Sequence, residues 1–443
     1  MKVRSWLNTC STSICATTTH DSTIPFPKNP SHSPEHLVSD SSSDNRGSAT
    51  SSSASSNDTS YSSLHSNLSL LTLPSVPSLQ KLFPETLGFS VSHISVTSIK
   101  PRPKQPITCV AVQGNLLYAA SVNEINVYDR ETSTLLDVYN SQDSSSGSVK
   151  SVTFCNEKIF TAHQDCKIRV WQMTMNKKHK FLIALPTFND RLRRFILPKN
   201  YVYVRRHVKR LWIEHTDAVT GLAVNKGLIY SVSWDKTLKI WRASDVRCLQ
   251  SIKAHDDAIN AVTASADGTV YTGSADRRIR VWAKSSGEKC YALVATLEKH
   301  KSAVNALALN YDGSVLFSGA CDRSILVWER EDSANYMAVT GALRGHGKAI
   351  LSLINVFDLL MSGSADRTVR IWQRGVEGKY CCLAVLEGHQ KPVKTLTAVK
   401  EDGNSDVVSV ISGSLDGEIR TWKMSVSRTS SPSSTTDVPE WNL

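Results

Sequence analysis

The stretch that decides the fold is TVYTGSADRRIRVW, residues 269–282. An alternating apolar run, typical of a half-buried strand, is followed by a turn and a second alternating run that ends in tryptophan. Similar stretches recur, and six of them end at Trp171, Trp241, Trp282, Trp328, Trp372 and Trp422. The spacings are 70, 41, 46, 44 and 50 residues. Repeats of about 40 to 50 residues built from short strands are typical of propeller blades.

Polar residues recur in step with these tryptophans. An aspartate lies six residues before each tryptophan, a Ser or Thr lies four residues before each aspartate, and a histidine opens each of the last five units. The five complete sets are His215, Ser231, Asp235, Trp241; His255, Thr272, Asp276, Trp282; His300, Ser318, Asp322, Trp328; His346, Ser362, Asp366, Trp372; and His389, Ser412, Asp416, Trp422. Indole donates, hydroxyl and imidazole donate and accept, and carboxylate accepts, so each set can form a buried structural tetrad.

Ser, His and Asp in every unit also raise the possibility of a hydrolase. A catalytic triad, however, occurs once and exposes its nucleophile to substrate, whereas near-identical sets in successive repeats indicate structural roles. The GHGKA stretch at 345–349 lacks the first glycine and the final hydroxyl of a phosphate-binding loop. The histidines lack metal-ligand spacing. The sequence therefore predicts no catalytic residues, no cofactor, no metal site and no enzymatic activity.

On these motifs, and on the Gly-His pairs at 345–346 and 388–389, the sequence resembles a WD40-repeat protein over about three quarters of its length. It departs from the family pattern because no aspartate follows the tryptophans. With Tyr128 as a degenerate unit end, the resemblance implies an all-β, seven-bladed propeller over residues 91–424.

Two further stretches, LTLPSVPSLQ at 71–80 and RRFILPKNYVYVRRHVKRLWIEH at 193–215, resemble the plant JINGUBANG-like group of WD40 proteins. This second resemblance implies a plant source and a regulatory, non-enzymatic role.

The two ends of the chain are rich in Ser and Thr. Residues 1–90 and 425–443 are predicted to be disordered, because such compositions cannot bury enough apolar area to order the chain. An apolar island at 68–83 interrupts the first region. No window approaches the length of a bilayer span, so no membrane partner is expected.

The first two units are eroded. In the first, Arg102 stands about where a histidine would be and Ala119 replaces the hydroxyl; in the second, the Ser-rich stretch at 144–148 replaces the histidine. These blades should be the loosest. The segment from Ile94 to Ile99 resembles the outer strand of a unit, so it is expected to complete the last blade and close the ring.

The net charge of +11 is a local feature. Residues 176–212 hold eleven Lys and Arg against one acid, whereas the rest of the chain holds 40 basic and 39 acidic groups. The segment explains the 70-residue spacing and is predicted to be an insert between blades two and three. A solvated loop, an import signal, an acidic-protein docking site and a nucleic-acid contact remain open for it, carried by Arg205, Arg206, Lys209 and Arg210.

The resemblance also implies that the residue before the repeat aspartate faces the narrow opening of the ring. Trp234 occupies this position in the third unit, and exposed tryptophans are common binding anchors. Basic residues follow the aspartate at Lys236, Arg277, Arg323 and Arg367. They are candidates for binding an acidic or phosphorylated peptide, although turn solvation and local pairing with acids are the favoured explanation.

These features predict a non-catalytic scaffold that regulates a plant developmental or transcriptional process by binding proteins, such as transcription regulators, through its top face and basic insert. The propeller is expected to be a monomer within complexes, in the nucleus or cytoplasm. A substrate receptor of a cullin-RING ubiquitin ligase is a second class, although Arg330 and Arg374 lie one place too early for the adaptor-binding pattern. An RNA- or DNA-associated protein is a third.

Overall fold

The computed structural model describes residues 89–428 except 206, 286, 331–336, 376–379 and 402–406. Within them the chain forms seven four-stranded antiparallel sheets and one two-stranded sheet. The first four sheets in chain order are β2–β5 (Ile107–Gln113, Leu116–Ser121, Glu124–Asp129, Leu135–Tyr139), β6–β9 (Val149–Cys155, Lys158–His163, Ile168–Met173, His179–Leu185), β12–β15 (Val219–Asn225, Leu228–Ser233, Thr237–Arg242, Cys248–Lys253) and β16–β19 (Ile259–Ala264, Val270–Ser274, Ile279–Ala283, Ala292–Leu297).

The remaining three sheets complete the set of blades. They are β20–β23 (Val304–Leu309, Val315–Ala320, Ile325–Arg330, Met337–Leu343), β24–β27 (Ile350–Val356, Leu359–Ser364, Val369–Arg374, Tyr380–Leu386) and β28–β30 (Val393–Lys400, Val407–Ser414, Ile419–Arg428) with β1 (Phe89–Ile99). A short 3₁₀ helix, η2 (Ser144–Ser146), precedes β6.

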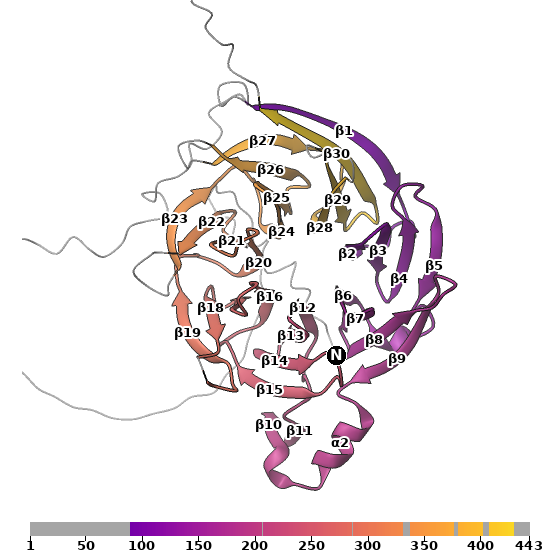
Figure 1. Ribbon diagram of the computed structural model, residues 1–443, viewed down its shortest axis with the longest axis vertical. Coiled ribbons are helices and arrows are strands. Elements are labelled where there is room, and N and C mark those ends of the chain that lie inside the picture. Colours follow the sequence, from indigo (N-terminus) through magenta and orange to yellow (C-terminus); the bar gives the residue numbers. More distant parts are fainter. Residues whose placement is uncertain are drawn as a thin grey trace, which may run out of the picture. The chain divides into compact units, whose positions relative to one another are not determined.

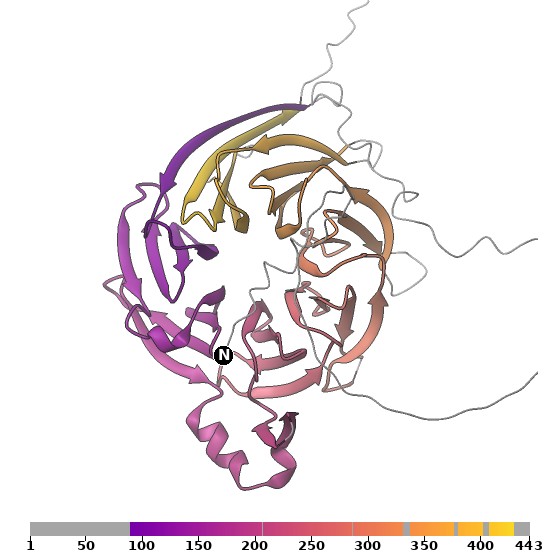
Figure 2. The same cartoon turned by 180° about the vertical axis from the view of Figure 1, so that it is seen from behind.

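The sheets are the blades of a closed propeller (Figure 1, Figure 2). The first strand of each blade lies nearest the centre and contacts the first strand of the next blade, and β28 contacts β2 to complete the circle. β1 pairs antiparallel with β30, from Phe89 opposite Arg428 to Ile99 opposite Ile419. The seven-bladed all-β prediction is therefore confirmed, and the last blade takes its outer strand from the beginning of the propeller.

The core consists of seven hydrophobic clusters, one between each pair of neighbouring blades. Each repeat tryptophan packs against the preceding blade, as Trp282 packs against Tyr230 and Val232. Tyr128 takes the equivalent place between the last blade and the first. Because neighbours cover both faces of a blade, its second strand is almost wholly buried, which explains why these strands carry apolar and small residues without a polar face.

Close approach between blades requires small residues beside the tetrad hydroxyls. A Cβ added to Gly319 would lie 2.5 Å from Ile350 Cγ2 in the next blade, and one added to Gly413 would lie 2.6 Å from Ile107 Cγ2. Both distances are far below van der Waals contact, so any larger residue would separate the two blades.

The described residues also revise three predicted boundaries. β1 begins at Phe89 and β30 ends at Arg428, so strands extend beyond the predicted limits of 91 and 424. The predicted insert, 176–212, is too long at its start, because β9 supplies the fourth strand of blade two. The predicted apolar island and most of both predicted disordered ends lie outside the described residues. No helix among the described residues has the length and apolar character to cross a membrane.

The shorter insert is folded. It contains α2 (Phe188–Phe195), the 3₁₀ helix η3 (Pro198–Asn200) and a hairpin of β10 (Tyr201–Arg205) and β11 (Val208–Leu211). The Thr187 hydroxyl accepts a hydrogen bond from the Asp190 backbone N–H and so caps α2. In both views this segment projects from the outer edge of the ring (Figure 1, Figure 2).

Ring closure by β1 yields the first prediction. Deletion of residues 1–100 removes the partner of β30 and leaves an unpaired edge, so we expect the melting temperature to fall by roughly 5 °C or more. Deletion of residues 1–85 keeps β1 and serves as the control. Differential scanning calorimetry of both truncations provides the measurement, and equal melting temperatures would contradict the role of β1.

Candidate functional site

The tetrads are assembled as hydrogen-bond chains. In blade three, the Trp241 indole N–H donates to Ser231 Oγ at 2.9 Å, Ser231 Oγ lies 2.8 Å from His215 Nε2, and His215 Nδ1 lies 2.9 Å from Asp235 Oδ2. In all five sets the Nδ1–Oδ2 distances are 2.7–3.2 Å. Because the hydroxyl accepts from the indole, it donates to Nε2, and Nδ1–H donates to the carboxylate. Every hydroxyl of these sets is fully buried, which withholds it from any dissolved substrate.

Burial and hydrogen bonding set the charges within the tetrads. Burial lowers the pKa of His215, His346 and His389 against the raising effect of the neighbouring aspartate. Burial raises the pKa of Asp276, but hydrogen bonds from His255 and two backbone N–H groups outweigh it and bring the pKa to about 2. In blades three, six and seven, an ionised aspartate beside a neutral imidazole is therefore the stable arrangement at neutral pH.

Blade two replaces the missing histidine in a way that the sequence did not reveal. His163, on β7, lies with Nε2 2.7 Å from Thr161 Oγ1, which also accepts from the Trp171 indole. Arg169 binds the repeat carboxylate of Asp165 at 2.9 Å and also that of Asp143 at 2.5 Å. The Ser-rich stretch instead forms the η2 turn that follows Asp143. In blade two, ion pairs from the single arginine Arg169 to two aspartates thus replace the usual pair between histidine and aspartate.

Blade one uses a different ion pair. Arg102 Nη2 lies 2.6 Å from Glu124 Oε2, and the glutamate side chain is buried. Arg102 thus pairs with a buried acid of blade one, Glu124. The nearby Asn123 donates from its side-chain amide to backbone carbonyls instead.

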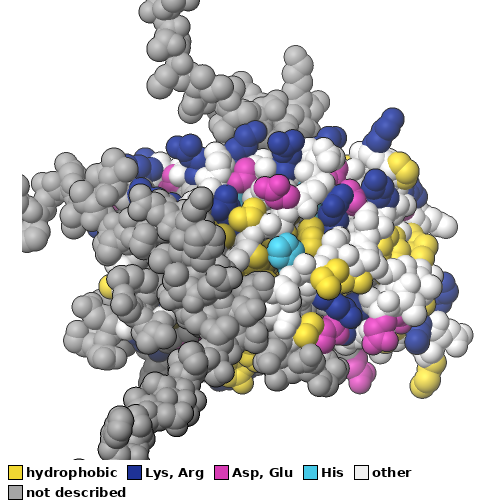
Figure 3. All heavy atoms as spheres, turned by 90° about the horizontal axis from the view of Figure 1, so that it is seen from above, with side chains coloured by type: hydrophobic (Ala, Val, Ile, Leu, Met, Phe, Trp, Pro, Cys, Tyr) yellow, Lys and Arg dark blue, Asp and Glu magenta, His cyan; other side chains and the backbone are white. Residues whose placement is uncertain are grey.

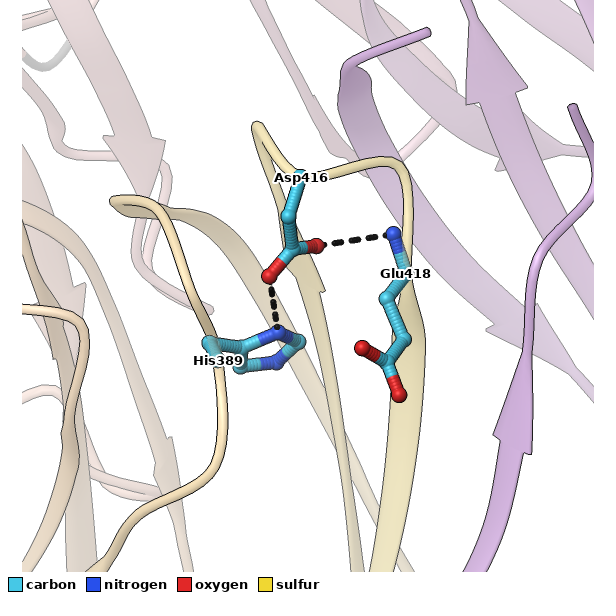
Figure 4. Close-up of side chains that lie close together, drawn as sticks. All are labelled: His389, Asp416 and Glu418. Carbon is cyan, nitrogen blue, oxygen red and sulfur yellow. Dashed lines mark hydrogen bonds and ion pairs between the residues drawn. The ribbon is translucent and has the colours of Figure 1, made fainter. Parts of the chain in front are cut away.

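One tetrad includes an additional acid. His389, Asp416 and Glu418 lie close enough together to suggest metal ligands (Figure 4). However, His389 Nδ1 lies 3.2 Å from Asp416 and Nε2 lies 2.7 Å from Ser412 Oγ. Glu418 is paired with Arg420 at 3.0 Å and also accepts from Ser98 Oγ. We therefore assign this cluster to the tetrad of blade seven and to the attachment of β1.

The predicted basic ring lies in the turn beside each tetrad. The residue after the repeat aspartate has a left-handed backbone, with φ of 69° at Lys236, 72° at Arg277, 69° at Arg323 and 77° at Arg367. The three arginines are exposed, whereas the half-buried Lys236 donates from Nζ to the Asp256 carbonyl at 2.6 Å. A left-handed backbone favours glycine over any residue with a side chain. The backbone conformation therefore does not explain why Lys or Arg occupies this position in four blades.

A bulge in the innermost strand of each blade places one residue toward the neighbouring blade. Thr220, Asn260 and Asn305 use their side chains to donate to backbone carbonyls of the next blade at 2.7, 3.0 and 2.9 Å. These three residues therefore hold adjacent blades together, and partner binding would have to compete with those bonds.

The bulge residue of blade two makes a different contact. Lys150, at the bulge of blade two, holds Nζ 5.8 Å from the centre of the Trp234 ring, and burial lowers the pKa of the lysine. Trp234 is half-buried and follows β13 in the turn that precedes Asp235. The structure thus pairs an aromatic ring with a cation beside the tetrad turn.

Of the four basic candidates of the insert, Arg205 ends β10, and Lys209 and Arg210 lie on β11. Lys209 and Arg210 are exposed on β11, and Lys209 Nζ lies 4.6 Å from the centre of the Tyr203 ring. Arg206 and the side chain of Arg205 lie outside the described residues.

Comparison with known families identifies the repeats. The model of the "WD domain, G-beta repeat" family matches residues 207–242, 246–283, 291–329, 338–373 and 380–423, which contain the tetrads of blades three to seven. Blades three to seven are therefore WD40 repeats. Blades one and two, where the tetrad is replaced by other pairs, lie outside the matched residues.

Two proteins of Drosophila melanogaster are similar to parts of this chain. The small ribosomal subunit protein RACK1 is 29% identical over 101 residues, which cover 22% of this chain and 30% of RACK1. Protein Notchless is 34% identical over 82 residues, which cover 18% of this chain and 16% of Notchless. The chain thus spans less than a third of the length of each of these two relatives.

The buried imidazole of His163 yields the second prediction. Burial lowers its pKa from 6.5 to about 3, so below pH 6.5 the unfolded chain binds a proton that the folded chain does not. The free energy of unfolding should therefore decrease as the pH is lowered. Between about pH 5.5 and about pH 4, this histidine contributes a loss of about 1.4 kcal/mol for each pH unit. In His163→Gln that part of the slope should vanish.

Urea denaturation at several pH values measures these slopes. His207→Gln, a change at an exposed histidine, is the matched control and should retain the wild-type slope. If His163→Gln and the wild type lose stability in parallel, His163 is not held neutral by burial.

Proposed function

We propose that this WD40-repeat protein is a non-catalytic scaffold that binds partner proteins through the face carrying the tetrad turns and through its basic insert. The tetrads support this role because their hydroxyl, imidazole and carboxylate groups are engaged inside the blades. Recognition is left to loops and turns that the blades hold in fixed positions.

The observation that carries the proposal is the half-buried Trp234 beside Lys150, next to a turn position that holds a cation in four successive blades. An amphipathic ring near a cation can contact an apolar side chain and a carboxylate of the same peptide. Arg277, Arg323 and Arg367 extend this cationic character around the ring. An acidic or phosphorylated segment is therefore the partner chemistry that we favour.

Two narrower roles have less support. Arg330 is paired with Asp267 at 3.3 Å and Arg374 with Glu329 at 2.9 Å, so both arginines considered for a ubiquitin-ligase adaptor have partners within the propeller. Nucleic-acid binding would rest on the insert alone, because the remainder of the chain is nearly neutral.

We further propose membership of the plant JINGUBANG-like group, and with it a role in a developmental or transcriptional process in the nucleus or cytoplasm. This proposal is supported by the stretches at 71–80 and 193–215. The expectation of a monomeric propeller within complexes is part of the same proposal.

Trp234→Ala provides the third prediction. Because the side chain is half-buried, its loss should remove about 1.4 kcal/mol or more of binding free energy, a tenfold or greater loss of affinity, for peptides that use this face. A panel of acidic and phosphorylated peptides, measured by fluorescence anisotropy, selects the ligand for the comparison. Tyr311→Ala is the control, because Tyr311 is 92% exposed in the β20–β21 turn. A panel bound equally by the wild type and Trp234→Ala would contradict the anchor role.

Nuclear import through the hairpin is the fourth prediction. Replacing Arg205, Arg206, Lys209 and Arg210 with glutamine removes four cations, which should lower the nuclear fraction of a fluorescently tagged protein. The control replaces Lys226, Arg242, Arg247 and Lys253 of blade three. An unchanged nuclear fraction in the hairpin variant would reject the import role.

A further inference from the structure

The insert is attached to the ring by one side only. Leu211 and Ile213 are buried in the hydrophobic cluster that joins blades two and three. Lys239 Nζ donates to the Trp212 carbonyl at 2.6 Å, and Arg191 of α2 pairs with Glu214 at 2.9 Å. These contacts fix the helix and hairpin on the rim as a rigid projection.

Its other side exposes large apolar side chains. Phe188, Leu192 and Phe195 are 76%, 56% and 65% exposed, and their spacing of four and three residues places them on one face of α2. Of the 21 large hydrophobic side chains exposed among the described residues, eight lie between residues 188 and 208. On the surface visible in Figure 3, by contrast, hydrophobic side chains lie among charged side chains of both signs. Such a concentration marks an interaction site.

The exposed side contains a pocket. A cavity of about 510 Å³ lies between α2 and the hairpin, with Phe188, Leu192 and Phe195 on the helix side. Tyr201 and Leu211 line it from the hairpin, and its charged lining residues are Arg191, Lys209, Arg210 and Glu214. This volume lies within the range of pockets that enclose ligands or partner side chains.

The charge around the pocket defines the occupant. Residues 186–214 hold eight Lys and Arg against Asp190 and Glu214, and both acids are already paired, with Arg194 at 3.3 Å and Arg191 at 2.9 Å. An apolar cavity surrounded by excess positive charge complements apolar side chains flanked by carboxylates. A bilayer surface would leave the concave cavity unfilled, and a nucleic-acid backbone would leave its apolar lining exposed to water.

We propose that this pocket is a second docking site, separate from the tetrad-turn face, and that it binds a partner segment carrying two or three large apolar side chains flanked by Asp or Glu. The inference rests on the proposed scaffold role and specifies the chemistry that the insert recognises. The apolar anchors enter between α2 and the hairpin, and the flanking carboxylates contact Lys209 and Arg210.

The test uses the full chain and synthetic 15-residue peptides. The main probe carries Phe, Leu and Phe at positions spaced by four and three residues, with Asp and Glu at most other positions. One matched peptide replaces the apolar residues with serine and another replaces the acids with lysine. Fluorescence anisotropy should give at least tenfold weaker binding for both, and weaker binding of the main probe when salt is raised from about 50 to about 300 mM.

Protein variants locate the site. Phe195→Ser and the double variant Lys209→Gln with Arg210→Gln should each weaken binding of the main probe at least tenfold. Phe357→Ser, a change at an exposed phenylalanine of another blade, should leave it unchanged. Equal melting temperatures establish that the exposed substitutions do not unfold the propeller.

The remaining outcomes overturn the proposal. Equal binding of the acidic-apolar and serine peptides would exclude the pocket as an anchor site. Tighter binding of phosphatidylserine vesicles or of polyuridine than of the main probe would assign the insert to a membrane or to RNA. Trp234→Ala separates the two hypotheses, because it should leave binding of the main probe unchanged. If Phe195→Ser also leaves that binding unchanged, only the pocket proposal is rejected, and the role of the tetrad-turn face is unaffected.

Discussion

The structure depends on the hydrogen-bond chain that runs from indole through hydroxyl and imidazole to carboxylate. Its central oxygen in blade three, Ser231 Oγ, lies 2.9 Å from one nitrogen and 2.8 Å from another, so one small side chain satisfies two buried polar groups. The chain links the second and third strands to the connection that enters the blade. Five blades fix their turn geometry in this way, and together with the two eroded blades they close into a ring.

Blades one and two show that the acid beside the tetrad turn needs a partner, but that the partner does not have to be histidine. Arg169 occupies the place of a histidine by binding two carboxylates, and Arg102 pairs with Glu124 where no repeat aspartate exists. In both blades a buried acid keeps a cationic or hydrogen-bonding partner, which avoids the cost of an unpaired buried charge. A family pattern built on the tetrad overlooks such blades, although the backbone continues through them unchanged.

The sequence predicted the ring of blades and its closing strand. It did not predict the ion pairs of the eroded blades or the helix of the insert. The Asp–Trp spacing predicted the blades, and the pattern near Ile94 predicted the closing strand, because both depend on local periodicity. Arginines also lie four residues after the aspartate at Arg280 and Arg370, so nothing marked Arg169 as a substitute. The helix α2 of the insert was not predicted, because the many basic residues obscure the apolar face of the helix in the sequence. That face depends on helical spacing over only eight residues.

The positions of these exceptions concentrate binding capacity on one side of the ring. In blades three to five, bulge residues bind carbonyls of the following blade, and their polar groups serve the joint between blades. At the junction of blades two and three, Lys150 instead faces Trp234, and the same junction carries the projecting helix and hairpin. A partner that contacts both surfaces would gain from their fixed separation, since a rigid ring imposes little ordering cost on binding. On the two proposed sites, asymmetry in the repeats, rather than the repeats themselves, would give this propeller its specificity.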